Sequence, residues 1–134
     1  MKHAVLYADG ACRGNPGPAG SGAALMDGDG QVLAEAMRFL GHGTNNVAEY
    51  TALIIGLEEA RRQEVEDLEV RMDSKLVVEQ MNGKWRVRDA KLIPLAIRAH
   101  ELFAQFPKKR IRHIPREENA VADLLANRAI DEAA

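Results

Sequence analysis

Four carboxylic acids stand at positions where folding would turn them inward. Asp9 ends the apolar run HAVLYAD and Asp73 ends LEVRMD, so each is expected at the carboxyl end of a buried strand. Glu49 and Asp123 fall on the mainly apolar stripes of two amphipathic helices. All four side chains are therefore predicted to point toward the interior or toward one edge of a sheet.

Converging carboxylates repel one another and raise one another's pKa unless a cation joins them. Oxygen ligands without nitrogen or sulfur suit Mg²⁺ or Mn²⁺ rather than zinc. If their strands are parallel neighbours, about 4.8 Å apart, Asp9 and Asp73 meet at the edge where open α/β sheets bind ligands. One such acid alone is typical of a turn or a solvated helix, so the metal-site hypothesis depends on all four.

The elements that must position these acids are predicted in the order β-β-β-α-β-α-α-β-α. Strands are expected at 3–9, 68–73 and 109–114, and as a hairpin within 21–40 around Asp27-Gly28-Asp29-Gly30. Helices are expected from Asn45 or Asn46 through Gln63, and at 74–83, 89–106 and 119–130. Helical crossovers make the first, fourth and fifth strands parallel, so the pattern predicts an α/β fold with a five-stranded mixed sheet.

Composition narrows the class of protein. The 134 residues, 46% of them hydrophobic and 28% charged, fit one soluble globular domain. A single cysteine, Cys12, excludes an internal disulfide and a cysteine-based zinc cluster, and favours a reducing cytoplasm. No apolar run approaches the roughly 18 residues of a membrane span, and the first residues lack a signal-peptide pattern. We therefore expect a cytoplasmic protein without a membrane contact.

Charge is distributed unevenly along the chain. The net charge is −2, yet residues 84–112 contain nine basic and only two acidic residues. This asymmetry favours a surface that attracts phosphates in a molecule that holds cations elsewhere. A solvated helix face followed by a charged strand start would give the same pattern.

Four segments resemble, in order, the motifs of the type 1 ribonuclease H family. YADGACRGNPGP (7–18) is similar to the family's first strand and loop, and TNNVAEYTAL (44–53) to the segment with its second acid. MDSKLV (72–77) resembles the segment with the third acid, and REENAVADLLAN (116–127) the final helix with the fourth. The resemblance spans essentially the whole chain. It implies a ribonuclease H-like fold, with residues 1–134 forming a single catalytic domain.

The resemblance implies an endonuclease that hydrolyses the RNA strand of RNA–DNA hybrids and leaves 5′-phosphate and 3′-hydroxyl ends. Asp9, Glu49, Asp73 and Asp123 would bind two divalent metals, Mg²⁺ or alternatively Mn²⁺. One metal would activate a water and the other would stabilise the departing 3′ oxygen. Asp9 is the candidate bridging ligand. We expect a monomeric cytoplasmic enzyme that removes primers or R-loop RNA.

A further set of residues is implied in holding the hybrid. The Gly-rich loop and the following helix start would track the RNA strand and grip a phosphate of the DNA strand through Cys12, Arg13, Gly14, Asn15, Thr44, Asn45 and Asn46. Turn and cap roles for Asn15 and Asn45 are compatible with this function.

The family's basic protrusion is reduced here to NGKWRVRD (82–89). Lys84, Trp85 and Arg86 would supply a smaller version of it, which predicts weaker and more salt-sensitive binding of the hybrid. A position in the core fits Trp85 equally well.

His113 and Arg116 are the two candidates for a group that assists product release. His113 lies ten residues before Asp123, as in relatives that use a loop histidine, but KKRIRHIP reads as a strand up to Ile114. Arg116 lies in the loop and resembles a subgroup that uses arginine there, so we favour Arg116. Two other functions remain open: a hybrid-binding module with little catalytic activity, and a nuclease that prefers double-stranded RNA or RNA–DNA junctions.

Overall fold

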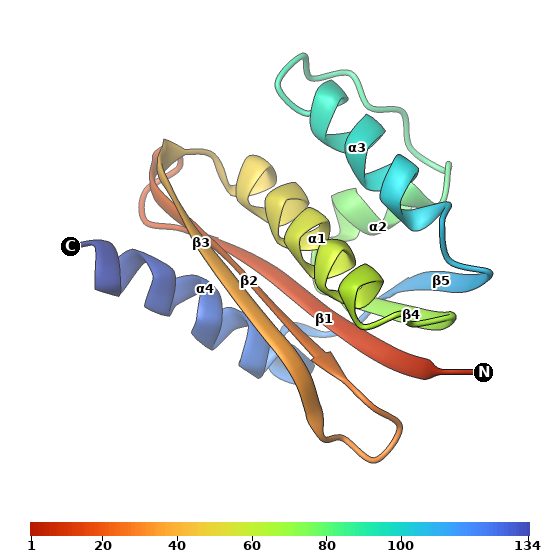
Figure 1. Cartoon of the computed structure of the whole chain (residues 1–134). Coiled ribbons are helices and arrows are strands. Elements are labelled where there is room, and N and C mark those ends of the chain that lie inside the picture. The colour runs from red at the N-terminus through yellow and green to blue at the C-terminus, as the bar shows by residue number, and fades with distance from the viewer.

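The computed structural model describes residues 1–134 and places helices on both faces of a five-stranded sheet (Figure 1). In chain order the elements are β1 (His3–Cys12), β2 (Gly17–Met26), β3 (Val32–Gly43), α1 (Asn45–Arg62), β4 (Asp67–Met72), α2 (Lys75–Met81), α3 (Ile93–Phe103), β5 (Lys108–His113), the short 3₁₀ helix η1 (Arg116–Glu118) and α4 (Ala120–Ala133). No helix has the length and apolar character that crossing a bilayer requires.

The strand order is β3-β2-β1-β4-β5. β1 is parallel to β4, and β4 is parallel to β5, whereas β1, β2 and β3 form antiparallel pairs. This confirms the predicted mixed sheet and its parallel half. The helices α1, α2 and α3 lie on one face and α4 alone covers the other (Figure 1). A site at the β1–β4 edge can therefore receive side chains from both helical layers.

The predicted end of the first strand and the predicted helix cap are wrong here, although α1 begins at Asn45 as expected. β1 does not end at Asp9 but continues to Cys12, because Asp9 still pairs with Gly22 of β2. What ends there is the parallel ladder, whose last pair is Ala8 and Met72. Thr44, rather than Asn45 or Asn46, caps α1, and its side chain accepts a hydrogen bond from the backbone N–H of Val47.

Close contact between sheet and helices depends on glycine, as Gly22 and Gly10 illustrate. A Cβ atom on Gly22 of β2 would lie 2.5 Å from the backbone nitrogen of Ala126 and 2.6 Å from the carbonyl oxygen of Ala122, both in α4. A Cβ atom on Gly10 of β1 would lie 2.5 Å from the backbone nitrogen of Glu49 in α1. Each glycine thus lets one helix backbone lie directly on the sheet.

Two arginines of the basic segment 84–112, Arg110 and Arg112, form hydrogen bonds with an acid of the neighbouring strand. Glu69 of β4 accepts hydrogen bonds from Arg71, from Arg110 (2.8 Å) and from Arg112 (3.2 Å). Burial raises the pKa of Glu69, but these three hydrogen bonds outweigh it and lower the pKa to about 2. Arg110 and Arg112 of β5 therefore pair with an acid of the sheet, which agrees with the interpretation of these basic residues as a charged strand start.

Candidate active site

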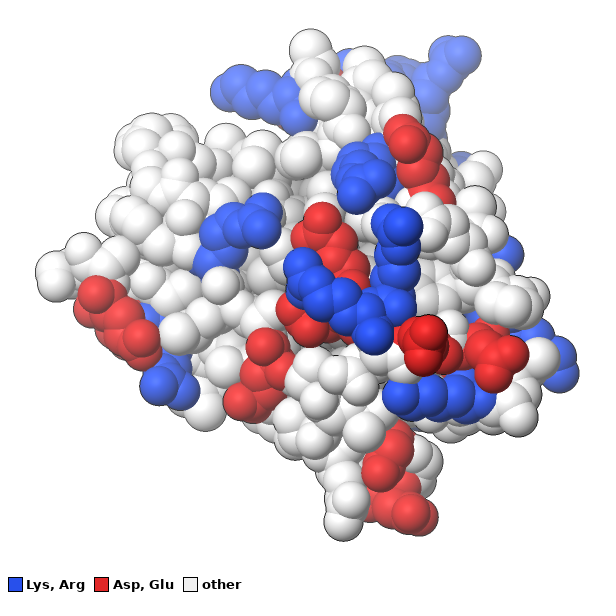
Figure 2. Space-filling view, in the orientation of Figure 1, with Lys and Arg blue, Asp and Glu red and all other residues white.

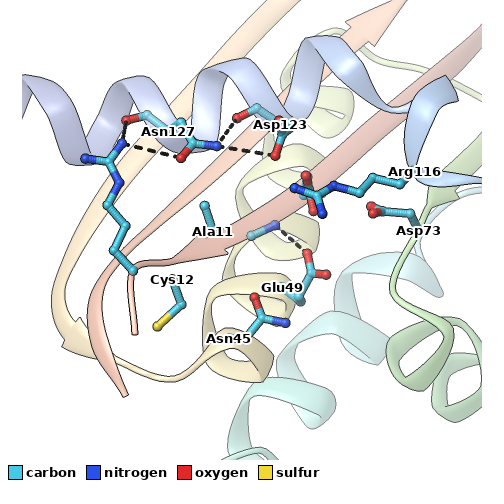
Figure 3. Close-up of a pocket in the computed structure, with 11 residues that line it drawn as sticks. Ala11, Cys12, Asn45, Glu49, Asp73, Arg116, Asp123 and Asn127 are labelled. Carbon is cyan, nitrogen blue, oxygen red and sulfur yellow. Dashed lines mark hydrogen bonds between the residues drawn. The ribbon is translucent and has the colours of Figure 1, made fainter. Parts of the chain in front are cut away.

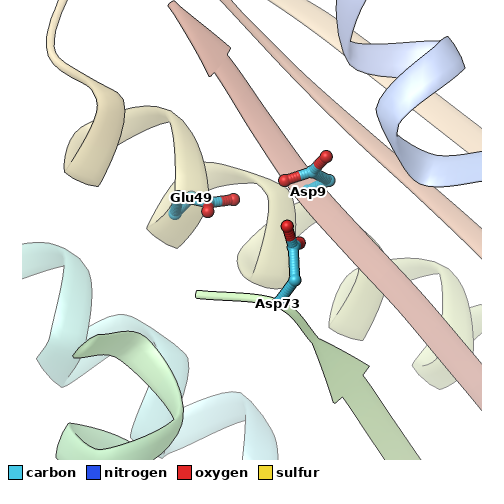
Figure 4. A group of neighbouring side chains, drawn as sticks. All are labelled: Asp9, Glu49 and Asp73. Atoms are coloured by element: carbon cyan, nitrogen blue, oxygen red, sulfur yellow. The ribbon is translucent and has the colours of Figure 1, made fainter. Parts of the chain in front are cut away.

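Three acids from separate elements meet at the end of the parallel ladder. Asp9 comes from β1, Glu49 from α1 and Asp73 from the residue that follows β4, and their carboxylates point toward one another (Figure 4). One carboxylate oxygen of each lies within 4.8 Å of the others. Asp9 and Glu49 are buried, and Asp73 is half-buried. The structure thus brings together three of the four predicted ligands as one cluster.

The first turn of α1 fixes the position of Glu49. Because Gly10 has no side chain, the backbone of α1 lies against β1 at Ala48 and Glu49. The backbone N–H of Gly10 donates a hydrogen bond to the Glu49 carboxylate (Figure 3). The residue after Asp9 therefore orients the second acid of the cluster.

Asp123 faces the same cavity from the other helical layer, outside the three-acid cluster (Figure 3). The predicted stripe for this residue is partly wrong, because Ala120 is exposed and Asp123 lies half-buried at the edge of the buried face of α4. The side chain of Asn127 donates to the Asp123 carboxylate at 3.3 Å. Asp123 can therefore contact a ligand in the cavity from the side of α4.

The cavity has a volume of about 330 Å³ and a mostly polar lining. Besides the four acids it is lined by Gly10, Ala11, Cys12, Arg13, Asn45, Arg116 and Asn127. In Figure 3, Arg116 extends from the η1 side toward the acids. Figure 2 shows acidic side chains gathered near the middle of one face, with basic side chains beside and across them.

The acids carry a large electrostatic penalty. Burial raises the pKa of Asp9, and the neighbouring charges of Glu49 and Asp73 raise it further. Burial also raises the pKa of Glu49, although hydrogen bonds from Asp9 and Gly10 offset part of this effect. No lysine, arginine or histidine forms an ion pair with any of the four acids. Clustered oxygen donors that form no ion pair with a protein side chain fit a bound divalent metal ion.

The predicted hybrid-binding residues of the first loop have structural contacts as well. Asn15 accepts a hydrogen bond from the backbone N–H of Asn45 at 3.1 Å, and the Cys12 thiol donates to the carbonyl oxygen of Gly14 at 2.8 Å. Arg13 pairs with Asp131 of α4 at 2.7 Å. Cys12, Arg13 and Asn45 line the cavity, whereas Gly14, Asn15, Thr44 and Asn46 lie outside it.

The short basic segment lies outside the cavity. Lys84, Trp85 and Arg86 follow α2 and are exposed. Trp85 is 44% exposed, so the core position considered from the sequence is wrong. An exposed indole flanked by two cations is available for contact with a partner.

Arg116 and His113 take different positions. Arg116 lies in η1 and lines the cavity. His113 is the last residue of β5, one residue before the predicted strand end, and does not line the cavity. Its Nε2 atom lies 3.2 Å from the backbone carbonyl oxygen of Asp73.

Sequence reasoning missed two asparagines at the site. Asn119 donates a hydrogen bond to the Asp73 carboxylate at 2.8 Å, and Asn127 contacts Asp123 as described above. Asn119 lies four residues before Asp123, but that position indicates only the start of a helix. The contact of Asn119 with Asp73 joins segments 46 residues apart, which spacing does not reveal. Asn127 lies four residues after Asp123 on the same helix, so helical spacing could have indicated its contact.

Comparison with known proteins gives consistent matches. Residues 7–129 match a family model described as reverse transcriptase-like. A protein named as bifunctional from Mycobacterium tuberculosis is 49% identical over 97% of this chain and 36% of its own length. A ribonuclease H from Alcanivorax borkumensis is 35% identical over 98% of this chain and 94% of its own length. The chain thus spans about a third of the length of the mycobacterial relative.

Two solved structures are similar along nearly their whole chains. The N-terminal RNase H domain of a Mycobacterium tuberculosis protein, solved as a fusion with maltose-binding protein, has a TM-score of 0.96 and 47% identity. The match covers 99% of this chain and 96% of the mycobacterial chain. LC11-RNase H1 in complex with an RNA/DNA hybrid has a TM-score of 0.91 and 42% identity, and covers 97% of this chain and 98% of that one.

Proposed function

This chain belongs to the ribonuclease H family, and we propose that it is an endonuclease that hydrolyses the RNA strand of RNA–DNA hybrids. The products would carry 5′-phosphate and 3′-hydroxyl ends. The observation that carries the proposal is the convergence of Asp9, Glu49 and Asp73 on one point beside a cavity that Asp123 also faces. The hybrid bound to LC11-RNase H1 supports the choice of substrate. Residues 1–134 would act as one catalytic domain.

The four acids are the proposed ligands of two Mg²⁺ ions, with Mn²⁺ as the alternative. Asp9 is the proposed bridging ligand, because it is buried on the central strand β1 with its carboxylate within 4.8 Å of those of both Glu49 and Asp73. When bound, Mg²⁺ would neutralise the cluster, activate a water molecule as the nucleophile and stabilise the 3′ oxygen that leaves.

The protein's own side chains would orient the scissile strand. Cys12, Arg13 and Asn45 line the cavity next to the acids, where they can contact the RNA strand and its 2′-hydroxyl groups. Glu49 points into the same space and would accept a hydrogen bond from the 2′-hydroxyl beside the cut. Outside the cavity, Lys84, Trp85 and Arg86 would hold the DNA strand, and Thr44 would help to grip one of its phosphates. Gly14 and Asn15 would track the RNA strand, and Asn46 would help to position the hybrid.

A panel of substrates tests this function. Labelled RNA–DNA hybrid, double-stranded RNA, an RNA–DNA junction and double-stranded DNA are each incubated with the protein, with Mg²⁺ and with a chelator. We expect cutting of the hybrid alone, only with metal, and 5′-phosphate ends on the products. Tight binding of hybrid without cutting in Mg²⁺ or Mn²⁺ would instead identify a binding module. Comparable cutting of double-stranded RNA or of the junction would identify the other nuclease class.

Arg116 is the proposed group that assists turnover. Replacing Arg116 by Ala should lower kcat about 10- to 100-fold, because a cation that lines the cavity would no longer contact the charged product. His113→Ala should change kcat less than threefold. Multiple-turnover and single-turnover rates on the same hybrid separate product release from bond cleavage. A slower turnover in the histidine variant alone would show that the assignment is reversed.

A cytoplasmic location, a monomeric state and a role in removing primers or R-loop RNA stay predictions from the sequence. Size-exclusion chromatography coupled to light scattering measures the oligomeric state directly.

A further inference from the structure

Asn119 occupies the position that precedes α4, yet its side chain does not cap the helix. It is 1% exposed, and its Nδ2 atom donates two hydrogen bonds away from α4. One reaches the carbonyl oxygen of Ala8 at 2.9 Å and the other reaches Oδ1 of Asp73 at 2.8 Å. This amide therefore links the strand that carries Asp9 to the carboxylate of Asp73.

The arrangement costs stability at two places. An asparagine at this position ordinarily accepts a hydrogen bond from the first turn of its helix, and here the first turn has no side-chain cap. The Oδ1 atom of Asn119 is buried without any hydrogen-bond partner, which is rare and unfavourable in folded proteins. Local features that oppose stability in this way are expected where the geometry of a functional site depends on them.

Asp73 is the acid of the cluster that most needs such support. It follows the last pair of the parallel ladder, so sheet hydrogen bonds do not fix its backbone as they do that of Asp9. Asn119 is the only group that donates a hydrogen bond to its carboxylate. Without this contact, repulsion from Asp9 and Glu49 would favour rotamers that turn Asp73 out of the cavity.

We propose that Asn119 is a positioning residue that holds the Asp73 carboxylate at the metal-binding distance from Asp9 by bonding Asp73 and the Ala8 carbonyl with one amide group. This inference rests on the proposed function, since it assigns Asn119 to the same metal site. Groups that orient metal ligands in this way change metal affinity or activity by about 10- to 100-fold when they are replaced.

Asn119→Ser provides the sharpest test, because serine is a good helix cap but is too short to reach Asp73. Binding of MgCl₂ to the metal-free protein is measured by calorimetry, and kcat and KM are measured with an RNA–DNA hybrid. We expect Mg²⁺ affinity and kcat each to fall about 10- to 100-fold, KM to stay within threefold, and Tm to stay within a few degrees of wild type. Gln31→Ser is the control, since Gln31 is an exposed amide in the β2–β3 turn, away from the acids.

The measurements distinguish a failure of the role of Asn119 from a failure of the proposed nuclease function. Mg²⁺ affinity and kcat equal to those of Gln31→Ser would overturn the role of Asn119, as would a loss of activity that follows Tm while Mg²⁺ affinity stays at the wild-type value. Should Asn119→Ser not fold, Asn119→Ala takes its place, and unfolding of both would overturn the proposal, because Asn119 would then serve the fold. A wild-type protein that binds Mg²⁺ but cuts no hybrid contradicts the proposed function, while the Mg²⁺ affinities still decide the role of Asn119.

Discussion

Replacing Asp9 by Asn should abolish hydrolysis of the hybrid, with kcat falling by about 10³-fold or more, which corresponds to roughly 4 kcal/mol of transition-state stabilisation. The amide keeps the shape of the side chain but removes the charge at the centre of the three-acid cluster. Rates with labelled hybrid in saturating Mg²⁺ measure the effect. Asp29→Asn, an exposed acid in the β2–β3 turn, is the matched control and should keep the wild-type rate.

The same substitution should stabilise the metal-free protein. Because burial and neighbouring acids raise the pKa of Asp9 in the folded state, the folded protein binds more protons than the unfolded chain above the unfolded pKa of 3.8. The free energy of unfolding of the wild type therefore falls as pH rises above 3.8. Asp9→Asn has no carboxylate at this position and does not lose stability in this way. At pH 8 without metal we expect its Tm to be about 5 °C higher, and added Mg²⁺ should narrow the difference. A lower Tm for the variant would contradict the electrostatic account of the site.

Gly22→Ala should destabilise the fold by about 3 kcal/mol and lower Tm by roughly 10 °C. The added methyl group would meet backbone atoms of α4 at 2.5 and 2.6 Å, and a helix backbone cannot move aside as a side chain can. Displacement of α4 would also move Asp123 away from the cavity. Thermal unfolding followed by circular dichroism measures the loss.

Gly28→Ala is the control for this prediction. Gly28 lies in the β2–β3 turn, and the nearest atom to a Cβ there is 4.0 Å away in His3. The free energy of unfolding of Gly28→Ala should stay within about 0.5 kcal/mol of the wild-type value. Equal Tm values for the two alanine variants would mean that α4 does not lie as close to β2 as described.

The sequence contained enough to predict the order of the elements and the three-acid cluster. Hydrophobic runs ending in Asp9 and Asp73 place both acids at one edge once the crossovers make their strands parallel, and helical spacing turns Glu49 inward. These inferences succeed because strand and helix periodicity are local properties of the chain.

What could not be predicted depends on contacts between distant segments. The continuation of β1 to Cys12 follows from pairing with β2, and the half-buried position of Asp123 follows from how α4 lies on the sheet. Asn119 reads as an ordinary helix cap until the structure places the Ala8 carbonyl and Asp73 within its reach. That Arg116 lines the cavity and His113 does not depends likewise on how the chain continues after β5.

The four acids come from β1, from α1, from the residue after β4 and from α4, which lies alone on its side of the sheet. During synthesis on a ribosome, Asp9, Glu49 and Asp73 emerge long before Asp123. Until α4 docks on its face of the sheet, the fourth carboxylate is missing from the cavity. The proposed nuclease activity would require that docking, because Asp123 reaches the cavity only from α4.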